Sequence, residues 1–389
     1  MDAVTIQYLL HLGFAAYAAR HRLPGYQHRA MRALMACRTA LLGGHVQSCP
    51  EGHVTRIWYN SCRHRMCPQC AWLQVERWLQ KQTARLLVCD HYHVIFTLPS
   101  ELHGLWRFND KQMANLLFRA VHETLRELLW DTKYLGAEVG IMAALHTWSQ
   151  TLTLHPHIHC LVTGGGLTTD NRWRPVRGGF LLPIRVVMAV YRGKLLWLLD
   201  QALRRGDLVL PPEMAARQWT HLRRQLGRVK WNVHIRERYA HGSGVLTYLA
   251  RYLRGGPLSN RRLISYSNGQ VSFRVRGPGE GSSGSRGVIR LTLEEFIRRY
   301  LQHVPLPGAR LVRCYGLYAC NNGEALSMCR AQVGGDLSEA CAGGWTEAEA
   351  LGLQREWPRC EVCGLELVVE TLWGSGLSPP EMVWGEKVA

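Results

Sequence analysis

Two histidines that flank a single apolar residue are the side chains of this chain best placed to do chemistry. His157 and His159 lie on either side of Ile158, within the apolar run 154–162. Because side chains alternate across a β-strand, both imidazoles would project from one face while Ile158 projects from the other. Two imidazoles on one face can bind the same divalent cation. A His-x-His pair is common by chance, so this interpretation needs support from elsewhere in the chain.

Two tyrosines four residues apart could supply nucleophiles. Tyr248 and Tyr252 lie in the segment 244–256, whose apolar spacing and closing glycines predict a short helix with both rings on one face. Tyrosines at this spacing are more often part of a core. The surrounding cations nevertheless fit phenolic oxygens that meet phosphate better than a dry core. The arginines concerned are Arg251, Arg254, Arg261 and Arg262.

The histidines and tyrosines together define a reaction on DNA. A phenol has a pKa of about 10 and is a poor nucleophile at neutral pH, so it needs a partner that activates the phosphate. A divalent cation on His157 and His159 would bind phosphate oxygens and offset the developing charge. Attack by a tyrosine would form a covalent phosphotyrosine and free the other DNA end as a hydroxyl. Strands could then be cut and rejoined without a high-energy cofactor.

A cysteine-rich segment predicts a structural zinc site. Two turns, one ending in a Cys-x-x-Cys knuckle, can supply four ligands to tetrahedral zinc and leave no open position. The simplest set takes two ligands from each turn, but Cys62 and His64 are close enough to substitute, so the choice of four stays open. Cys37 and His45 are expected to be plain structural residues of the adjoining helix and loop. The zinc candidates are Cys49, His53, Cys62, Cys67 and Cys70.

A second half-knuckle, Cys360-Glu-Val-Cys363, lies near the end of the chain. No partner for it is evident, so the sequence does not by itself predict a second zinc ion. The cysteines that could conceivably complete it are Cys314, Cys320, Cys329 and Cys341.

Composition and charge indicate a DNA-binding protein of the cytoplasm. The 389-residue chain has a formal net charge of +18, which favours a polyanionic partner. No uninterrupted apolar segment is long enough for a membrane span. The start does not resemble a secretory signal, because acidic Asp2 stands in place of a basic region and His11 interrupts the apolar stretch. The 13 cysteines are clustered, which is more typical of metal ligands in a reducing compartment than of disulfides.

The order of elements predicts an α+β fold in three consecutive parts. A strand over 91–99, a helix over 112–129 and two strands over 140–150 and 154–163 indicate an antiparallel sheet covered by helices. Gly164, Gly165 and Gly166 are expected to form a loop after the histidine strand. Further helices are expected over 26–41, 72–88 and 291–300. The expected parts are a zinc-binding domain (1–88), a catalytic domain (89–265) and a C-terminal region (266–389).

These motifs together resemble one known family. His157-Ile158-His159 with Tyr248 and Tyr252, behind the cysteine block 60–70, is similar to the two-tyrosine rolling-circle insertion-sequence transposases, the IS91 family. The resemblance extends over nearly the whole chain. The other segments that carry it are 93–99, 150–166, 248–262, 293–300 and 314–317.

The resemblance implies an HUH-type endonuclease with an N-terminal zinc-binding domain and a catalytic domain on a central antiparallel sheet. Such enzymes nick single-stranded or hairpin DNA at element ends and leave a 5′-phosphotyrosine. The expected ion at His157 and His159 is Mg²⁺ or Mn²⁺, and the third ligand is open, with Gln150 and His155 nearest and His93 a weaker candidate. Many relatives have Cys-x-x-Cys where this chain has Cys49 and His53, which also leaves the zinc ligands open.

Two other classes of protein share part of this pattern. A replication initiator or relaxase of a plasmid or phage would use the same chemistry in another cellular role, and the full-length resemblance favours a transposase over it. A zinc-containing DNA-binding regulator without catalysis would make the histidines and tyrosines merely structural. A tyrosine recombinase is disfavoured, because its arginine and histidine constellation around one C-terminal tyrosine is not apparent.

Overall fold

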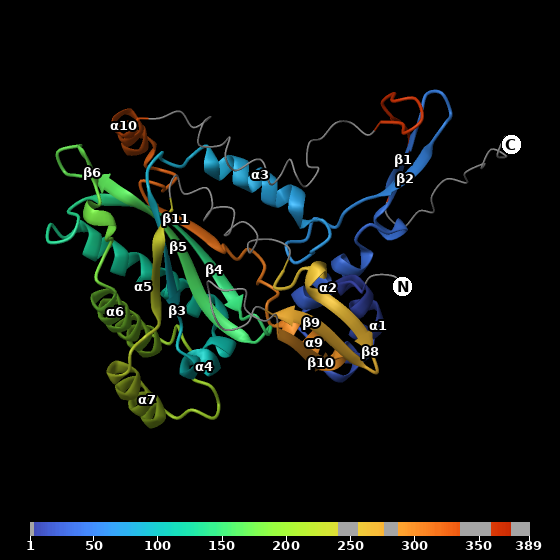
Figure 1. The fold of residues 1–389 in the computed structure, drawn as a ribbon. Helices are drawn as coiled ribbons and strands as arrows, with labels where there is room; N and C mark the ends of the chain where they lie inside the picture. The colour runs from blue at the N-terminus through green and yellow to red at the C-terminus, as the bar shows by residue number, and fades with distance from the viewer. Residues whose placement is uncertain (1–3, 240–255, 276–286, 335–358, 375–389) are drawn as a thin grey trace. The chain divides into compact units, whose positions relative to one another are not determined.

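A computed structural model of the chain (Figure 1) describes residues 4–239, 256–275, 287–334 and 359–374. These residues form two compact units that are each built from segments distant in the sequence. The first unit draws on 1–74, 254–304 and 345–389, and the second on 75–253 and 305–344. The division therefore differs from the three consecutive parts expected, 1–88, 89–265 and 266–389, because long-range packing rather than chain order decides which segments share a core.

A six-stranded sheet forms the centre of the second unit. Its order is β11-β4-β5-β3-β7, with β6 paired to β5. Every pairing is antiparallel, so the α+β fold with an antiparallel sheet is confirmed. The strands are β3 (His91–Thr97), β4 (Glu138–Trp148), β5 (Leu154–Leu167), β6 (Trp173–Pro175), β7 (Val233–Tyr239) and β11 (Val312–Gly316).

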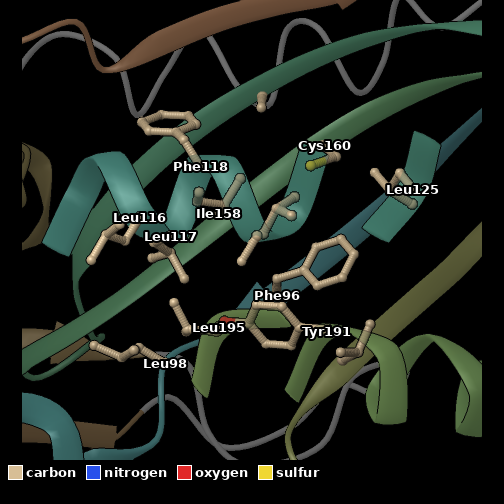
Figure 2. Packing of buried hydrophobic residues seen from close by; sticks show 14 of the residues in the cluster. Phe96, Leu98, Leu116, Leu117, Phe118, Leu125, Ile158, Cys160, Tyr191 and Leu195 are labelled. Atoms are coloured by element: carbon tan, nitrogen blue, oxygen red, sulfur yellow. The ribbon is translucent and has the colours of Figure 1, made fainter. Parts of the chain in front are cut away.

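Helices pack against both faces of this sheet. On one face, residues of α4, α5, α6 and α7 build the main hydrophobic core, and Figure 2 shows α5 and α6 side chains meeting Phe96 and Ile158 of the strands. On the other face, residues of α3 and α10 pack against Met142 and Leu161. The helices are α3 (Ala71–Thr83), α4 (His103–Phe108), α5 (Asp110–Trp130), α6 (Ile184–Arg204), α7 (Ala216–Arg228) and α10 (Gly323–Val333), with short 3₁₀ turns η2 (Ser100–Leu102) and η3 (Arg177–Gly179).

The alternation of side chains along β3 and β5 sorts apolar residues from histidines. Phe96, Ile158 and Cys160 face the main core and are fully buried. Their neighbours in sequence, among them His93 and His159, must then face the opposite side of the sheet. The strand geometry expected for the His-x-His pair is therefore present, and it puts several histidines on one face.

The three glycines after the histidine strand do not form a loop. Gly164, Gly165 and Gly166 continue β5, where they pair with β4 and β6. A Cβ atom on Gly164 would lie 2.7 Å from the carbonyl oxygen of Asp90, and one on Gly166 would lie 2.5 Å from that of Glu138. The glycines are therefore explained by close backbone approach within the sheet rather than by contact with a ligand.

The described residues of the first unit form two small antiparallel sheets and three α-helices. One sheet has the order β12-β1-β2 and the other β10-β9-β8. Gly13 of α1 lies against α9, where an added Cβ atom would lie 2.7 Å from Ile297 and Leu293. The elements are α1 (Ile6–Arg20), α2 (Gly25–Ala36), η1 (Ala40–Leu42), β1 (Gly44–Ser48), β2 (Thr55–Tyr59), η4 (Asn260–Arg262), β8 (Leu263–Ser267), β9 (Gln270–Val275), β10 (Gly287–Thr292), α9 (Leu293–Leu301) and β12 (Val368–Trp373).

The helices expected within the described residues are present, with differences at their ends, whereas the helix expected over 244–256 lies outside them apart from Gly256. α5 exceeds the expected 112–129 by a few residues, and α9 begins at Leu293 because the Thr292 side chain accepts a hydrogen bond from the Glu295 amide and caps it. α2 ends at Ala36, earlier than expected, because Cys37 adopts extended backbone angles. That early end separates Cys37 from the helix and places it beside the cysteine-rich segment.

Candidate functional site

Three histidines on one face of the central sheet converge on a single point. His157 and His159 come from β5, and His146 lies on β4 directly opposite His157. Their ligand nitrogen atoms all lie within 4.8 Å of one another. The ring centroids of His146 and His159 are 4.4 Å apart, and those of His157 and His159 are 4.8 Å apart. This spacing suits three nitrogens that share one metal ion.

Hydrogen bonds at the Nδ1 atoms orient two of these rings. The Nδ1 atom of His157 lies 2.6 Å from the backbone oxygen of His155. Because a carbonyl oxygen only accepts, Nδ1 of His157 carries the proton and Nε2 keeps its lone pair. The Nδ1 atom of His159 lies 2.8 Å from Nε2 of His93. A hydrogen bond to one ring nitrogen that leaves the other for a metal is the usual arrangement of histidine ligands.

Burial keeps the three imidazoles neutral. It lowers the pKa of His157 to about 4. It also holds the pKa values of His146 and His159 well below the ordinary histidine value, with neighbouring histidines adding to the effect. A neutral imidazole is the form that binds a metal ion, since protonation removes the lone pair. The cluster is thus in its ligating form at neutral pH.

Neither of the two expected candidates for a third ligand is the third histidine of this cluster. Gln150 is exposed in the turn between β4 and β5. His155 is half-buried at the start of β5, where its backbone oxygen accepts from His157 and its ring centroid lies 5.1 Å from that of His157. The third histidine of the cluster is instead His146, which the sequence analysis did not single out.

The register of the β4–β5 hairpin, with an irregularity beside its turn, brings His146 to the histidine pair. The turn closes with a hydrogen bond from the Ser149 amide to the Thr153 oxygen. Counting outward from that turn pairs Trp148 with Leu154 and would bring His146 opposite Pro156, but a register shift between Trp148 and His146 places it opposite His157 instead. The Ser-Gln-Thr-Leu-Thr stretch between the strands is rich in turn-forming residues, so the turn itself was visible in the sequence.

The expected nucleophiles and two of the expected DNA-binding arginines lie outside the described residues. These are Tyr248, Tyr252, Arg251 and Arg254. Arg261 and Arg262 belong to the first unit, in η4 at the start of β8. Arg262 donates to the backbone oxygen of Arg274 at 2.8 Å and lies over the ring of Phe273.

Four cysteines form a compact cluster in the first unit. Cys37 follows α2, Cys62 follows β2, and Cys67 and Cys70 lie in the turn that leads into α3. Their sulfur atoms lie within 4.8 Å of one another, and the sulfurs of Cys62 and Cys70 are 3.6 Å apart. Hydrogen bonds from Cys62 and Cys67 lower the pKa of Cys37 to about 7. Four thiolates in this arrangement match a closed tetrahedral zinc site.

The cysteine cluster differs from the expected zinc ligands in two respects. Cys37 was expected to be a plain structural residue, but it lies in the cluster because α2 ends just before it. Cys49 and His53 were expected among the ligands of the same site, but they lie in a separate group with Cys360 and Cys363. The five candidates are therefore divided between two groups, because the hairpin of β1 and β2 carries Cys49 and His53 to its far end. His45 lies within β1 rather than in a loop.

Models of two protein families match this chain, and both describe transposases. Residues 140–325 match the family described as "Putative transposase", and residues 9–98 match the "Transposase zinc-binding domain" of IS91-type elements. The first match spans the histidine cluster, and the second spans the four-cysteine cluster. The N-terminal part of the chain is thus a zinc-binding domain of the transposase type.

Two relatives extend the similarity over most of the chain. It is 39% identical over 326 residues to the "Putative transposase y4qJ" of Sinorhizobium fredii, covering 82% of this chain and 81% of the relative. It is 30% identical over 292 residues to the "Transposase for insertion sequence element IS801" of Pseudomonas savastanoi pv. phaseolicola, covering 74% of this chain and 68% of the relative. The chain belongs to the IS91 family of insertion-sequence transposases.

Solved structures with a similar arrangement include the conjugative relaxase TrwC in complex with oriT DNA, in a metal-bound form. The sequence identity is 15%, with 41% of this chain and 71% of that chain covered and a TM-score of 0.24. A metal-free form of the same relaxase gives the same TM-score at 14% identity. That score is too low to carry a structural argument. Among the described residues, no helix combines the length and apolar character needed to cross a bilayer.

Proposed function

We propose that this transposase cuts and rejoins single-stranded DNA at the ends of its element through 5′-phosphotyrosine intermediates, in a rolling-circle type of transposition. The observation that carries the proposal is the cluster of His146, His157 and His159, three neutral imidazoles whose nitrogens converge on the same face of one sheet. A core histidine needs only a hydrogen-bond partner. Three converging imidazoles with suppressed pKa values are better explained by a metal ion.

The donor set fits a divalent transition metal. Nitrogen ligands suit Mn²⁺ better than Mg²⁺, which prefers oxygen donors, so Mn²⁺ is the ion that we expect to bind more tightly. His146, His157 and His159 would hold it, with His157 fixed in its tautomer by the His155 carbonyl. The ion would supply Lewis-acid polarisation of a phosphodiester and offset its developing negative charge.

Tyr248 and Tyr252 are the proposed nucleophiles. The phenolic oxygen of one tyrosine bonds to phosphorus as the bond from phosphorus to the 3′ oxygen breaks. The 5′ side of the break then stays on the tyrosine, and the 3′ oxygen leaves as a hydroxyl after it gains a proton. Attack by that or another 3′ hydroxyl on the phosphotyrosine rejoins a strand and restores the tyrosine. Two tyrosines allow two such links at once, as strand transfer between two sites requires.

The zinc-binding domain and the basic residues are proposed to hold the DNA. The net charge of +18 gives the chain a strong attraction for the phosphate backbone. Arg251, Arg254, Arg261 and Arg262, which lie close to the tyrosines in the sequence, are the expected phosphate contacts. Structural zinc is assigned to Cys37, Cys62, Cys67 and Cys70, whose sulfurs would close a four-thiolate site.

A labelled single-stranded oligonucleotide that carries the end of the element tests this function. We expect the full-length protein to form a covalent adduct with the oligonucleotide in the presence of Mn²⁺ and to lose it on chelation. The variant with both His157→Ala and His159→Ala should bind the oligonucleotide and form no adduct. Absence of a metal-dependent adduct with wild-type protein at any end sequence would eliminate the proposed chemistry and favour a non-catalytic DNA-binding role.

A further inference from the structure

A second group of metal-binding side chains joins residues from opposite ends of the chain within the first unit. Cys49 and His53 come from the β1–β2 hairpin, and Cys360 and Cys363 come from the segment just before β12. Their ligand atoms all lie within 4.8 Å of one another. The sulfur of Cys49 lies 3.5 Å from that of Cys363 and 3.7 Å from Nδ1 of His53. Two of the four ligands lie outside residues 9–98, which match the zinc-binding family.

The two turns that carry these ligands have matching backbone geometry. The amide of Cys49 donates to the oxygen of Val54 at 2.8 Å, and the amide of Cys360 donates to the oxygen of Leu365 at 2.8 Å. In each turn a glycine returns a hydrogen bond of 2.9 Å to the oxygen of the leading cysteine: Gly52 in the first and Gly364 in the second. Both glycines adopt positive φ angles, +75° and +76°, which other residues rarely tolerate. Each turn is thus folded back tightly enough to present two ligands to one ion.

The C-terminal turn also presents an amide to its own sulfur. The amide of Val362 lies 3.4 Å from the sulfur of Cys360. Amide donors stabilise a thiolate over a thiol, and a thiolate is the form that binds zinc.

The strand that follows this turn is built into the N-terminal sheet. β12 pairs with β1 in antiparallel register from Gly44 opposite Trp373 to Ser48 opposite Val368. The apolar cluster beneath the four ligands is very small, with Cys49, Cys360 and Leu367 buried and Val54 packed against them. So little apolar surface contributes only a modest hydrophobic stabilisation to an association between segments more than 300 residues apart.

We propose that the chain binds two zinc ions, and that the second, held by Cys49, His53, Cys360 and Cys363, fastens the C-terminal turn to the N-terminal hairpin. Three thiolates and one imidazole complete a tetrahedral zinc site with no open position, so this ion is structural. Its binding free energy supplies the stability that the small apolar cluster lacks. The site is independent of the tyrosine chemistry proposed above.

Metal counting on the reduced, full-length protein tests the two-zinc arrangement. Native mass spectrometry together with elemental analysis should find two zinc ions per chain in the wild type. The variant with Cys360→Ser and Cys363→Ser should retain one. Cys320→Ser is the matched control, because Cys320 is exposed and belongs to neither group, and it should keep two. One zinc in the wild type, or two in the double variant, would overturn the proposal.

Two further measurements keep the test decisive if the double variant folds poorly. His53→Cys should keep two zinc ions, because a thiolate replaces the imidazole, whereas His53→Ala should lose or weaken the second ion alone. Cobalt substitution then reports the ligands, since thiolate-to-cobalt absorbance should rise in His53→Cys relative to wild type. A disulfide between Cys49 and Cys363 is the competing structure. Freshly purified protein lighter by two hydrogens and lacking the second zinc would establish that disulfide and refute the metal site.

Discussion

The Nε2 atom of His93 lies 2.8 Å from the Nδ1 atom of His159, across the two central strands of the sheet. The residues lie diagonally, because His93 pairs with Leu161 and His159 pairs with Ile95. Both side chains are almost completely buried. In the proposed metal site His159 keeps Nε2 for the ion, so its Nδ1 carries the proton and donates to His93. His93, considered from the sequence as a weaker candidate ligand, is then a residue that positions His159.

Replacing His93 with alanine is expected to weaken Mn²⁺ binding by about 10- to 100-fold, since His159 loses the acceptor that holds its tautomer and ring orientation. Calorimetric titration of the full-length protein with Mn²⁺ measures the effect. His91→Ala is the matched control, because His91 lies on the same strand, is also buried, and bonds to the Tyr318 hydroxyl instead. Equal affinity in wild type and His93→Ala would show that the contact does not orient a ligand.

Replacing His146 with alanine should reduce adduct formation more than about 100-fold, because the cluster loses one of three ligands, a larger change than the loss of a supporting contact. Gln150→Ala and His155→Ala should each retain most of the activity, since Gln150 is exposed and His155 contributes its backbone oxygen. The three variants are compared in the oligonucleotide assay at saturating Mn²⁺. If Gln150→Ala lost activity while His146→Ala stayed active, Gln150 rather than His146 would be the third ligand.

Tyr248→Phe and Tyr252→Phe should each interrupt a different part of the transposition cycle, because each removes one phenolic oxygen while keeping the ring. Adduct formation on the labelled oligonucleotide and transposition in cells are the two measurements. The double variant should form no adduct at all. Normal transposition by both single variants would contradict the use of two nucleophiles.

Removal of zinc should destabilise the first unit more than the second. The second metal group joins β12 to the hairpin of β1 and β2 through a small sheet and few apolar residues, whereas the described part of the second unit has an extensive hydrophobic core and no cysteine group. Hydrogen exchange followed by mass spectrometry, with and without a chelator, separates the two. We expect faster exchange in β1, β2 and β12 and little change in the core-facing strands β3 and β5. If the removal of zinc left hydrogen exchange unchanged in both units, the metal would have no structural role.

Tyr300→Phe should lower the free energy of unfolding by about 1 to 3 kcal/mol, the usual cost of leaving a buried polar group without its partner. The Tyr300 hydroxyl donates to the backbone oxygen of Met66 at 2.8 Å, and the side chain is fully buried. This bond ties α9 to the loop that carries Cys67. Urea unfolding measures the change, with Tyr8→Phe at an exposed position as the control expected to stay within about 0.5 kcal/mol. Equal unfolding curves for the two variants would contradict this role.

Local patterns in the sequence predicted much of the framework correctly. The period-two alternation around Ile158 placed His157 and His159 on one face, away from the main core, and the antiparallel sheet covered by helices is present. The helix over Leu293–Leu301 follows from its Thr292 cap and its apolar spacing. These features depend on residues within a few positions of each other, which is the range over which propensity and periodicity act.

Residue groupings that depend on strand register or on long-range contact were harder to predict. His146 joined the histidine cluster only once the β4–β5 register was known. Gly164, Gly165 and Gly166, which have the composition of a loop, are part of β5 because the neighbouring strands and side chains approach too closely for a Cβ atom. A glycine-rich run has the same composition in a loop and in a crowded strand, so composition alone could not distinguish them.

The sequence by itself determined which side chains are candidates for the proposed chemistry: the histidine pair, the tyrosine pair and the cysteine knuckles are all evident from residue type and local spacing. Only the tertiary structure decided how these groups combine. It completed the histidine pair with His146, brought Cys37 to the knuckle of Cys67 and Cys70, and placed Cys49 beside Cys363, 314 residues away. The physical reason is that a metal site requires ligands close in space. Distant segments come close together through the packing of the whole chain, and local sequence patterns do not predict that packing.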